Sequence, residues 1–130
     1  MIVDTSVLIC LLREEPDHGR FVHALAESAD EITISAANYL ETAIVIDANN
    51  NPALSERFDA VIEFWHIAVA PVTPEQARLA RTAYRQFGKG RHPAALNFGD
   101  CFAYALAKET GRPLLYKGAD FTRTDVTPAA

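Results

Sequence analysis

The chain alternates between short apolar runs and longer stretches in which apolar residues recur every three or four positions. The short runs, typical of buried strands, lie at residues 1–4, 31–35, 67–70 and 114–116, and Val126 begins a further one. The longer stretches have the period of helices with one apolar face. Strands that alternate with helices predict an α/β domain whose mainly parallel central sheet has four to five strands and helices on both faces.

Capping residues set the expected helix boundaries. Thr5 and Ser6 follow the first strand as good helix N-caps, and Thr73 followed by Pro74 marks the start of a later helix. The expected helices cover residues 5–12, 17–28, 36–48, 54–65, 74–86 and 99–108.

The composition is that of an average globular domain, with 49% hydrophobic and 22% charged residues. At 130 residues, the chain is expected to form one domain over residues 1–130. No run reaches the roughly 20 apolar residues of a membrane span, and a carboxylate stands at position 4, before any apolar stretch that a signal peptide needs. Cys10 and Cys101 lack the spacing of a disulfide scaffold or a metal motif. We therefore expect a cytoplasmic protein with reduced thiols and no membrane partner.

The formal net charge of −5 argues against a nucleic-acid partner, because phosphate binding depends on Lys and Arg. The distribution changes this picture, since residues 1–65 hold 12 acidic and 3 basic residues whereas residues 66–130 hold 5 acidic and 9 basic residues. One stretch without acids contains Arg78, Arg81, Arg85, Lys89, Arg91 and His92. The helical spacing of its three first arginines suits either a solvated helix face or a stripe that contacts nucleic-acid phosphates.

Four acidic residues stand where a ligand site is expected. Asp4 ends the first strand, Asp100 lies in the first turn of a helix, and Asp120 follows the fourth strand. Each also has an ordinary interpretation, as a helix cap, a partner of the helix dipole or a loop aspartate. Glu41 lies on an apolar helix face that we expect to be buried, made of Ala37, Leu40, Ile44 and Ala48. A carboxylate there needs either an arginine partner or a metal.

Parallel strands would bring these acids to one edge of the sheet. Two negative charges about 5 Å apart repel by about 3 kcal/mol at an effective dielectric constant of about 20, so four clustered carboxylates predict a bound cation. Oxygen ligands favour Mg²⁺, with Mn²⁺ as a substitute. Such an ion activates water for attack on phosphorus and neutralises the departing oxygen, which indicates phosphodiester hydrolysis.

The motifs around these acids resemble those of the PIN-domain ribonucleases and, within that family, of the VapC toxins. Met1 to Ser6 is similar to the opening motif of the family, Tyr39 to Glu41 to its second acid, Leu96 to Cys101 to its third, and Leu114 to Phe121 to its closing strand and fourth acid. The resemblance implies a PIN-like three-layer α/β/α sandwich and cleavage of RNA that depends on Mg²⁺ or Mn²⁺. It also implies a homodimer and inhibition by a VapB-like antitoxin.

The resemblance and the clustering together assign roles to the acids. The metal ligands, direct or through water, would be Asp4, Asp100 and Asp120. Glu41 would orient or deprotonate the attacking water. Relatives often carry another Asp or Asn where this chain has Ala119, so Asp125 stays an alternative to Asp120 as the fourth acid.

Two other functions stay open at this point. A non-catalytic module would dock a partner helix on the apolar stripe of Leu54, Phe58 and Trp65, with the acids serving only the structure. A nuclease of similar architecture would act on DNA instead of RNA.

Overall fold

Four short parallel strands form the centre of the protein in the computed structural model, which describes residues 1–130. The strands are β1 (Ile2–Val3), β2 (Thr33–Ser35), β3 (Ala68–Ala70) and β4 (Leu114–Leu115). Their order across the sheet is β3-β2-β1-β4, so β1 lies between β2 and β4. Ile2 of β1 pairs with Thr33 of β2 and with Leu114 of β4. All pairs are parallel, which confirms the sheet predicted from the sequence.

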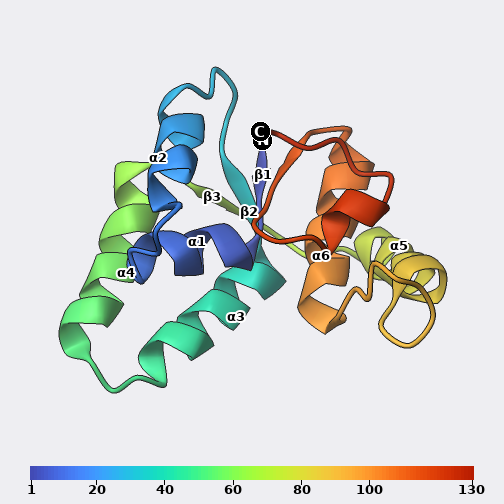
Figure 1. Cartoon of the computed structure of the whole chain (residues 1–130), viewed down its shortest axis with the longest axis horizontal. Coiled ribbons are helices and arrows are strands. Elements are labelled where there is room, and N and C mark those ends of the chain that lie inside the picture. The colour runs from blue at the N-terminus through green and yellow to red at the C-terminus, as the bar shows by residue number, and fades with distance from the viewer.

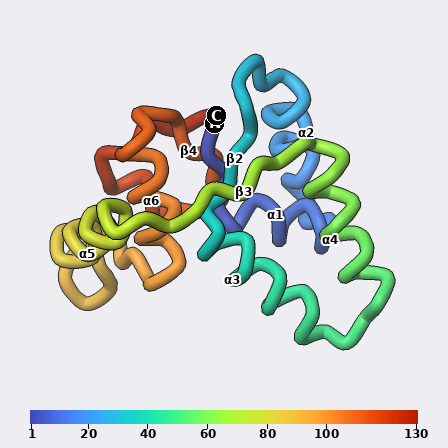
Figure 2. The backbone as a smooth tube through the Cα atoms, turned by 180° about the vertical axis from the view of Figure 1, so that it is seen from behind, coloured from blue at the N-terminus to red at the C-terminus, as the bar shows by residue number.

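Helices cover both faces of this sheet. They are α1 (Thr5–Leu12), α2 (His18–Ala26), α3 (Ala36–Asp47), α4 (Pro52–Phe64), α5 (Pro74–Phe87) and α6 (Phe98–Thr110), followed by the short 3₁₀ helix η1 (Phe121–Arg123). Figure 1 shows α1, α2 and α4 on one side of the strands and α5 and α6 on the other. The same separation is seen from behind in Figure 2. The predicted three-layer arrangement is therefore confirmed. None of the helices combines the length and the apolar character that a membrane span needs.

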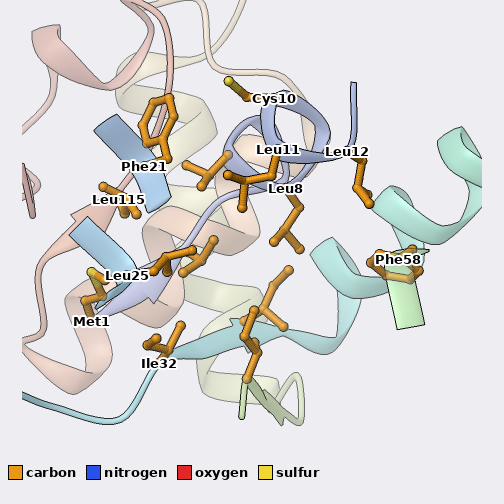
Figure 3. Close-up of a cluster of buried hydrophobic side chains, with 14 of the residues drawn as sticks. Met1, Leu8, Cys10, Leu11, Leu12, Phe21, Leu25, Ile32, Phe58 and Leu115 are labelled. Carbon is orange, nitrogen blue, oxygen red and sulfur yellow. The ribbon is translucent and has the colours of Figure 1, made fainter. Parts of the chain in front are cut away.

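Two hydrophobic cores lie on opposite faces of the sheet because neighbouring residues of a strand point to opposite faces. In β1, Val3 faces the core built with α1, α2 and α4, whereas Ile2 faces the core built with α5 and α6. In β4, Leu115 and Leu114 divide in the same way. Figure 3 shows the first core around Leu8, Phe21 and Leu115. Strands β1 and β4 are thus packed on both of their faces, which fixes the start of the loops that follow them.

The fifth strand expected at Val126 is not formed. A single parallel bridge joins Leu114 to Pro128, and no ladder extends from it. Val126 is nevertheless buried in the second core, which explains its apolar character without a strand.

The expected burial of the apolar face of α3 is wrong. Leu40 is 57% exposed and Ile44 is 60% exposed. The buried residues of α3 are Asn38, Thr42 and Ile46, because this is the side that packs toward α1, α4 and α6. On the buried side, the Asn38 amide nitrogen donates to the Gly99 carbonyl and the Thr42 hydroxyl donates to the Asn38 carbonyl. Leu40 and Ile44 lie on the surface instead.

The apolar stripe of α4 is mostly core. Phe58 is 3% exposed, and Leu54 and Trp65 pack partly buried against the first core. The stripe is therefore used mainly to pack α4 onto the first core, which does not favour the docking module suggested by the sequence.

Candidate active site

The strand order places the candidate acids at the carboxyl end of the sheet. Asp4 directly follows β1, and the loop that leads to Asp120 leaves the neighbouring strand β4. Glu41 lies in the second turn of α3, which begins directly after β2, and Asp100 lies in the first turn of α6. Helix α3 contacts both α1, which Asp4 caps, and α6, so the elements next to these acids meet at this edge.

Asp4 is a buried carboxylate that also caps a helix. Its side chain is 4% exposed, and its Oδ2 accepts a hydrogen bond of 3.0 Å from the backbone N–H of Ser6 at the start of α1. The pKa of Asp4 is raised to about 6, mainly by burial and to a smaller extent by the nearby Glu41 carboxylate, against the opposing effect of the Ser6 hydrogen bonds. The capping role is therefore real, but it leaves one oxygen of a poorly solvated carboxylate for another ligand.

Asp100 closes a capping box at the start of α6. Its Oδ2 accepts from the Asn97 N–H at 3.0 Å, and Asn97 Oδ1 accepts from the Asp100 N–H at 2.9 Å. Burial raises the pKa of Asp100 to about 7, opposed by the Asn97 N–H. The carboxylates of Asp4, Asp120 and Glu41 add to this rise in the pKa, in that order of size. Acids from four separate segments thus share one electrostatic environment.

Glu41 is held through one of its two oxygens. Its Oε1 accepts hydrogen bonds from the Thr5 hydroxyl at 2.6 Å and from the Asn38 amide at 3.2 Å. These donors come from α1 and from the preceding turn of α3, so the side chain is oriented by two elements. The Arg partner that the sequence allowed for Glu41 is absent. The carboxylate therefore faces the site without a countercharge.

Gly99 allows this carboxylate to lie against α6. A Cβ built at Gly99 would lie 2.1 Å from Glu41 Oε2 and 2.6 Å from Glu41 Cδ, which is closer than atoms can approach. The close approach of Glu41 to Gly99 and its hydrogen bonds from Asn38 and Thr5 were not predicted from the sequence. A signal for Asn38 was available, since it stands three residues before Glu41 and so shares its side of the helix.

Asp120 and Asp125 are distinguished by their partners. Asp125 accepts a hydrogen bond of 2.6 Å from the Tyr104 hydroxyl and forms an ion pair of 3.1 Å with Lys108. Asp120 is exposed and has no such partner, and its carboxylate contributes to the raised pKa of Asp100. These contacts favour Asp120 as the fourth acid of the site.

The donor set fits a hydrated divalent ion. Four carboxylates with no cationic side chain bonded to them are hard oxygen ligands, and two of them have raised pKa values that a cation would lower. No three of these acids have oxygens within 4.8 Å of one another. Mg²⁺ keeps several of its waters and binds few protein oxygens directly, so it does not require three carboxylates in such close contact.

A tighter group of possible ligands lies elsewhere, at Cys10, Glu15 and Asp17. The Lys117 ammonium lies 2.8 Å from a carboxylate oxygen of Glu15 and of Asp17 and 3.9 Å from the Cys10 sulfur. Hydrogen bonds from Lys117 hold the pKa values of both carboxyls below their usual range. This group already has its cation and is a salt bridge between the loop after β4 and the start of α2.

The basic residues predicted to bind nucleic acid lie on α5 and the loop after it. Arg78, Arg81, Arg85, Lys89 and Arg91 are exposed, and none of them forms an ion pair. Arg91 lies over the ring of Tyr84, 5.4 Å from its centroid. His92 is instead partly buried, where its Nδ1 accepts from the Ala94 N–H at 3.0 Å. The loop leads directly into the first turn of α6, which carries Asp100.

Comparison with known proteins identifies the family. A family model described as the PIN domain matches residues 1–126. The chain belongs to the PIN-domain family. The ribonuclease VapC28 of Mycobacterium tuberculosis is 52% identical over 130 residues, covering 99% of this chain and 97% of its own. A ribonuclease VapC of Mycolicibacterium smegmatis is 47% identical over 126 residues, covering 97% of each. These identities place this PIN domain in the VapC branch, as its motifs predicted.

Solved structures share the fold of this PIN domain. The crystal structure of VapC20 of Mycobacterium tuberculosis, described as a toxin that cleaves the sarcin-ricin loop, matches 97% of this chain and 95% of its own with a TM-score of 0.78 at 18% identity. A toxin-antitoxin complex from Klebsiella pneumoniae matches 95% of this chain and 92% of its own with a TM-score of 0.72 at 14% identity. The sheet and its helix layers are therefore those of VapC proteins.

Proposed function

We propose that this PIN domain is a Mg²⁺-dependent endoribonuclease, with Mn²⁺ as a substitute, and the toxin of a toxin-antitoxin pair. The observation that carries the proposal is the convergence of four acids at the carboxyl end of the sheet, with no cationic side chain bonded to any of them; they are Asp4, Glu41, Asp100 and Asp120. Mutual repulsion within such a set of carboxylates, which has no protein countercharge, favours the binding of a cation. The names of its relatives, which are VapC ribonucleases, supply the substrate class.

The residues divide into two roles. Asp4, Asp100 and Asp120 would hold the ion, directly or through water. When bound, the ion supplies a water of lowered pKa and neutralises charge on the oxygen that leaves phosphorus. Glu41 would orient or deprotonate an attacking water through Oε2, because the hydrogen bonds from Thr5 and Asn38 occupy Oε1.

RNA would reach the acids along α5. The exposed cations Arg78, Arg81 and Arg85, with Lys89 and Arg91 on the adjoining loop, would contact phosphates without reading sequence. His92 is a weaker member of this set, since its ring nitrogen already accepts a backbone hydrogen bond.

The proposed partners are a VapB-like antitoxin and a second copy of this chain. Structural neighbours include a VapBC2 complex from Rickettsia felis, which supports an antitoxin partner. The homodimer is supported by the exposed apolar surface of α3 and α6, where Leu40, Ile44 and Phe98 border a cavity of about 370 Å³. Phe98 is 81% exposed, which is unusual for so large an apolar side chain unless a partner covers it.

Replacing Asp4 with Asn tests the proposed activity. Purified protein is expected to cleave RNA but not DNA in the presence of Mg²⁺, and EDTA should stop the reaction. Asp4→Asn should abolish cleavage while circular dichroism shows an unchanged fold. The matched control is Asp125→Asn, whose carboxylate is paired with Lys108 and Tyr104 outside the proposed site and which should retain activity. Undiminished cleavage by Asp4→Asn, or equal cleavage of DNA, would overturn the proposal.

A further inference from the structure

Asn38 joins two parts of the proposed active site from within the protein interior. Its side chain is 0% exposed. Its Nδ2 donates to Glu41 Oε1 at 3.2 Å and to the Gly99 carbonyl at 2.9 Å. One amide group thus links the Glu41 carboxylate on α3 to the first turn of α6, where Asp100 lies.

The other end of this amide is unsatisfied. Asn38 Oδ1 is buried and has no hydrogen-bond partner in the protein. The amide cannot turn over, because its carbonyl oxygen would then face the Glu41 carboxylate and the Gly99 carbonyl, which are acceptors and cannot donate. A buried acceptor without a partner costs about 1–3 kcal/mol. Stability alone would therefore favour an apolar side chain of similar shape, such as leucine, at this position.

We propose that Asn38 is a positioning residue for catalysis, retained at a cost in stability because it orients Glu41. The inference rests on the proposed nuclease function. Asn38 acts together with the Thr5 hydroxyl, so that two donors fix Glu41 Oε1 and direct Oε2 to the side of α6 that Gly99 leaves open. Asn38 itself is buried and has no contact with RNA.

The substitution Asn38→Leu separates this role from a structural one. It removes the donor and the unsatisfied acceptor together, so the metal-free unfolding midpoint should stay the same or rise. The kcat for RNA cleavage should fall about tenfold or more, equivalent to about 1.4 kcal/mol, with KM within about twofold of the original value. The control is Asn49→Leu, at the end of the same helix, where the side chain bonds only nearby backbone carbonyls and kcat should not change. A fall in the midpoint together with an unchanged kcat would overturn the inference.

A double-mutant cycle with Glu41→Gln provides the second test. If Asn38 acts only through Glu41, Asn38→Leu should cause little further loss of single-turnover rate in the Glu41→Gln background. Equal losses in both backgrounds would overturn the inference, and so would a crystal structure of Asn38→Leu in which Glu41 keeps its contact with Thr5 and its place against Gly99. Failure of the nuclease proposal is distinct, because the unsubstituted protein would then show no Mg²⁺-dependent cleavage.

Discussion

At Gly99, the absence of a side chain decides whether Glu41 can face the start of α6. A methyl group there would lie 2.1 Å from Glu41 Oε2. Gly99→Ala should therefore displace the Glu41 carboxylate and reduce RNA cleavage by about 10²-fold or more, although all four acids remain. A cleavage assay with the folded variant measures this effect.

The matched control for Gly99→Ala is Gly19→Ala in α2. No atom lies within 4 Å of a Cβ built at Gly19, and alanine is a better helix former than glycine. This control should keep full activity with equal or higher stability. If Gly99→Ala cleaved RNA as fast as the control, the close approach of Glu41 to α6 would have no part in catalysis.

The buried carboxylates predict how stability depends on pH. The pKa of Asp4 is raised from 3.8 to about 6 and that of Asp100 from 3.8 to about 7, so both bind protons more tightly in the folded state. Their contribution to stability is complete below their unfolded pKa and is lost as the pH rises through their folded pKa values. The unfolding midpoint in EDTA should therefore fall between about pH 4 and about pH 7.

Mg²⁺ should reduce this fall, because it binds the ionised carboxylates of the folded state only. Thermal unfolding with and without the ion measures both effects. The double substitution Asp4→Asn with Asp100→Asn should flatten the pH dependence and remove the response to Mg²⁺. A metal-free midpoint that rises over the same pH range would contradict the assigned shifts.

The places of the candidate acids in the fold were predictable from the sequence, but the groups that orient them were not. Asp4 and Asp120 follow strands, and Asp100 opens a helix, which are local features. The bond from Asn38 to Gly99 joins residues 61 positions apart, and the bond from Thr5 to Glu41 spans 36. Such contacts depend on how α1, α3 and α6 pack together. No local pattern determines that packing.

At the scale of elements, helix ends were easier to predict than helix faces. The Thr73 cap and Pro74 set the start of α5 as expected, because capping depends on adjacent residues. The buried face of α3 was misjudged, since its most apolar side, with Leu40 and Ile44, lies on the surface. The rule that the apolar face of a helix packs into the core fails where an apolar face serves as a binding surface for another molecule.

Helix α5 supplies a prediction about RNA binding. Each phosphate contact to single-stranded nucleic acid adds about 0.7 to the slope of log K against log salt concentration. Replacing Arg78, Arg81 and Arg85 with Gln should therefore weaken binding and reduce the slope by about 2. Fluorescence anisotropy with an inactive Asp4→Asn background measures the slope over a range of salt concentrations.

The control uses the basic residues of the first half of the chain, which are Arg13, Arg20 and Arg57. Replacing these three arginines with Gln changes the net charge by the same amount as the substitutions on α5, but at residues outside that helix. It should leave the salt slope nearly unchanged. Equal effects of the two triple substitutions would show that net charge, and not the α5 stripe, governs binding.

At the scale of the whole molecule, the two halves of opposite charge fold onto opposite sides of the sheet. Residues 1–65, with 12 acidic and 3 basic residues, form α1 to α4, whereas residues 66–130, with 5 acidic and 9 basic residues, include α5 and α6 (Figure 1). The candidate site lies where these halves meet. A polyanion would therefore be attracted from the α5 side despite the net charge of −5.

The proposed dimer depends on the apolar surface shared by α3 and α6. Phe98 borders two cavities, one of about 370 Å³ beside α3 and one of about 470 Å³ beside α5. A charged side chain at this position would therefore face a partner that fills either cavity. Phe98→Asp should convert a dimer into a monomer, because it buries an unpaired carboxylate in the interface. Light scattering coupled to size-exclusion chromatography measures the mass.

The matched control is Phe64→Asp, which changes an aromatic residue that is 72% exposed on α4, on the far side of the sheet. This variant should remain a dimer, since Phe64 lies on α4, away from Phe98, with its ring packed edge-on against that of Trp65. A monomeric mass for the unsubstituted protein at micromolar concentration would contradict the dimer. Dissociation by Phe64→Asp but not by Phe98→Asp would move the interface to the α4 side and leave the exposure of Leu40, Ile44 and Phe98 for another partner to cover.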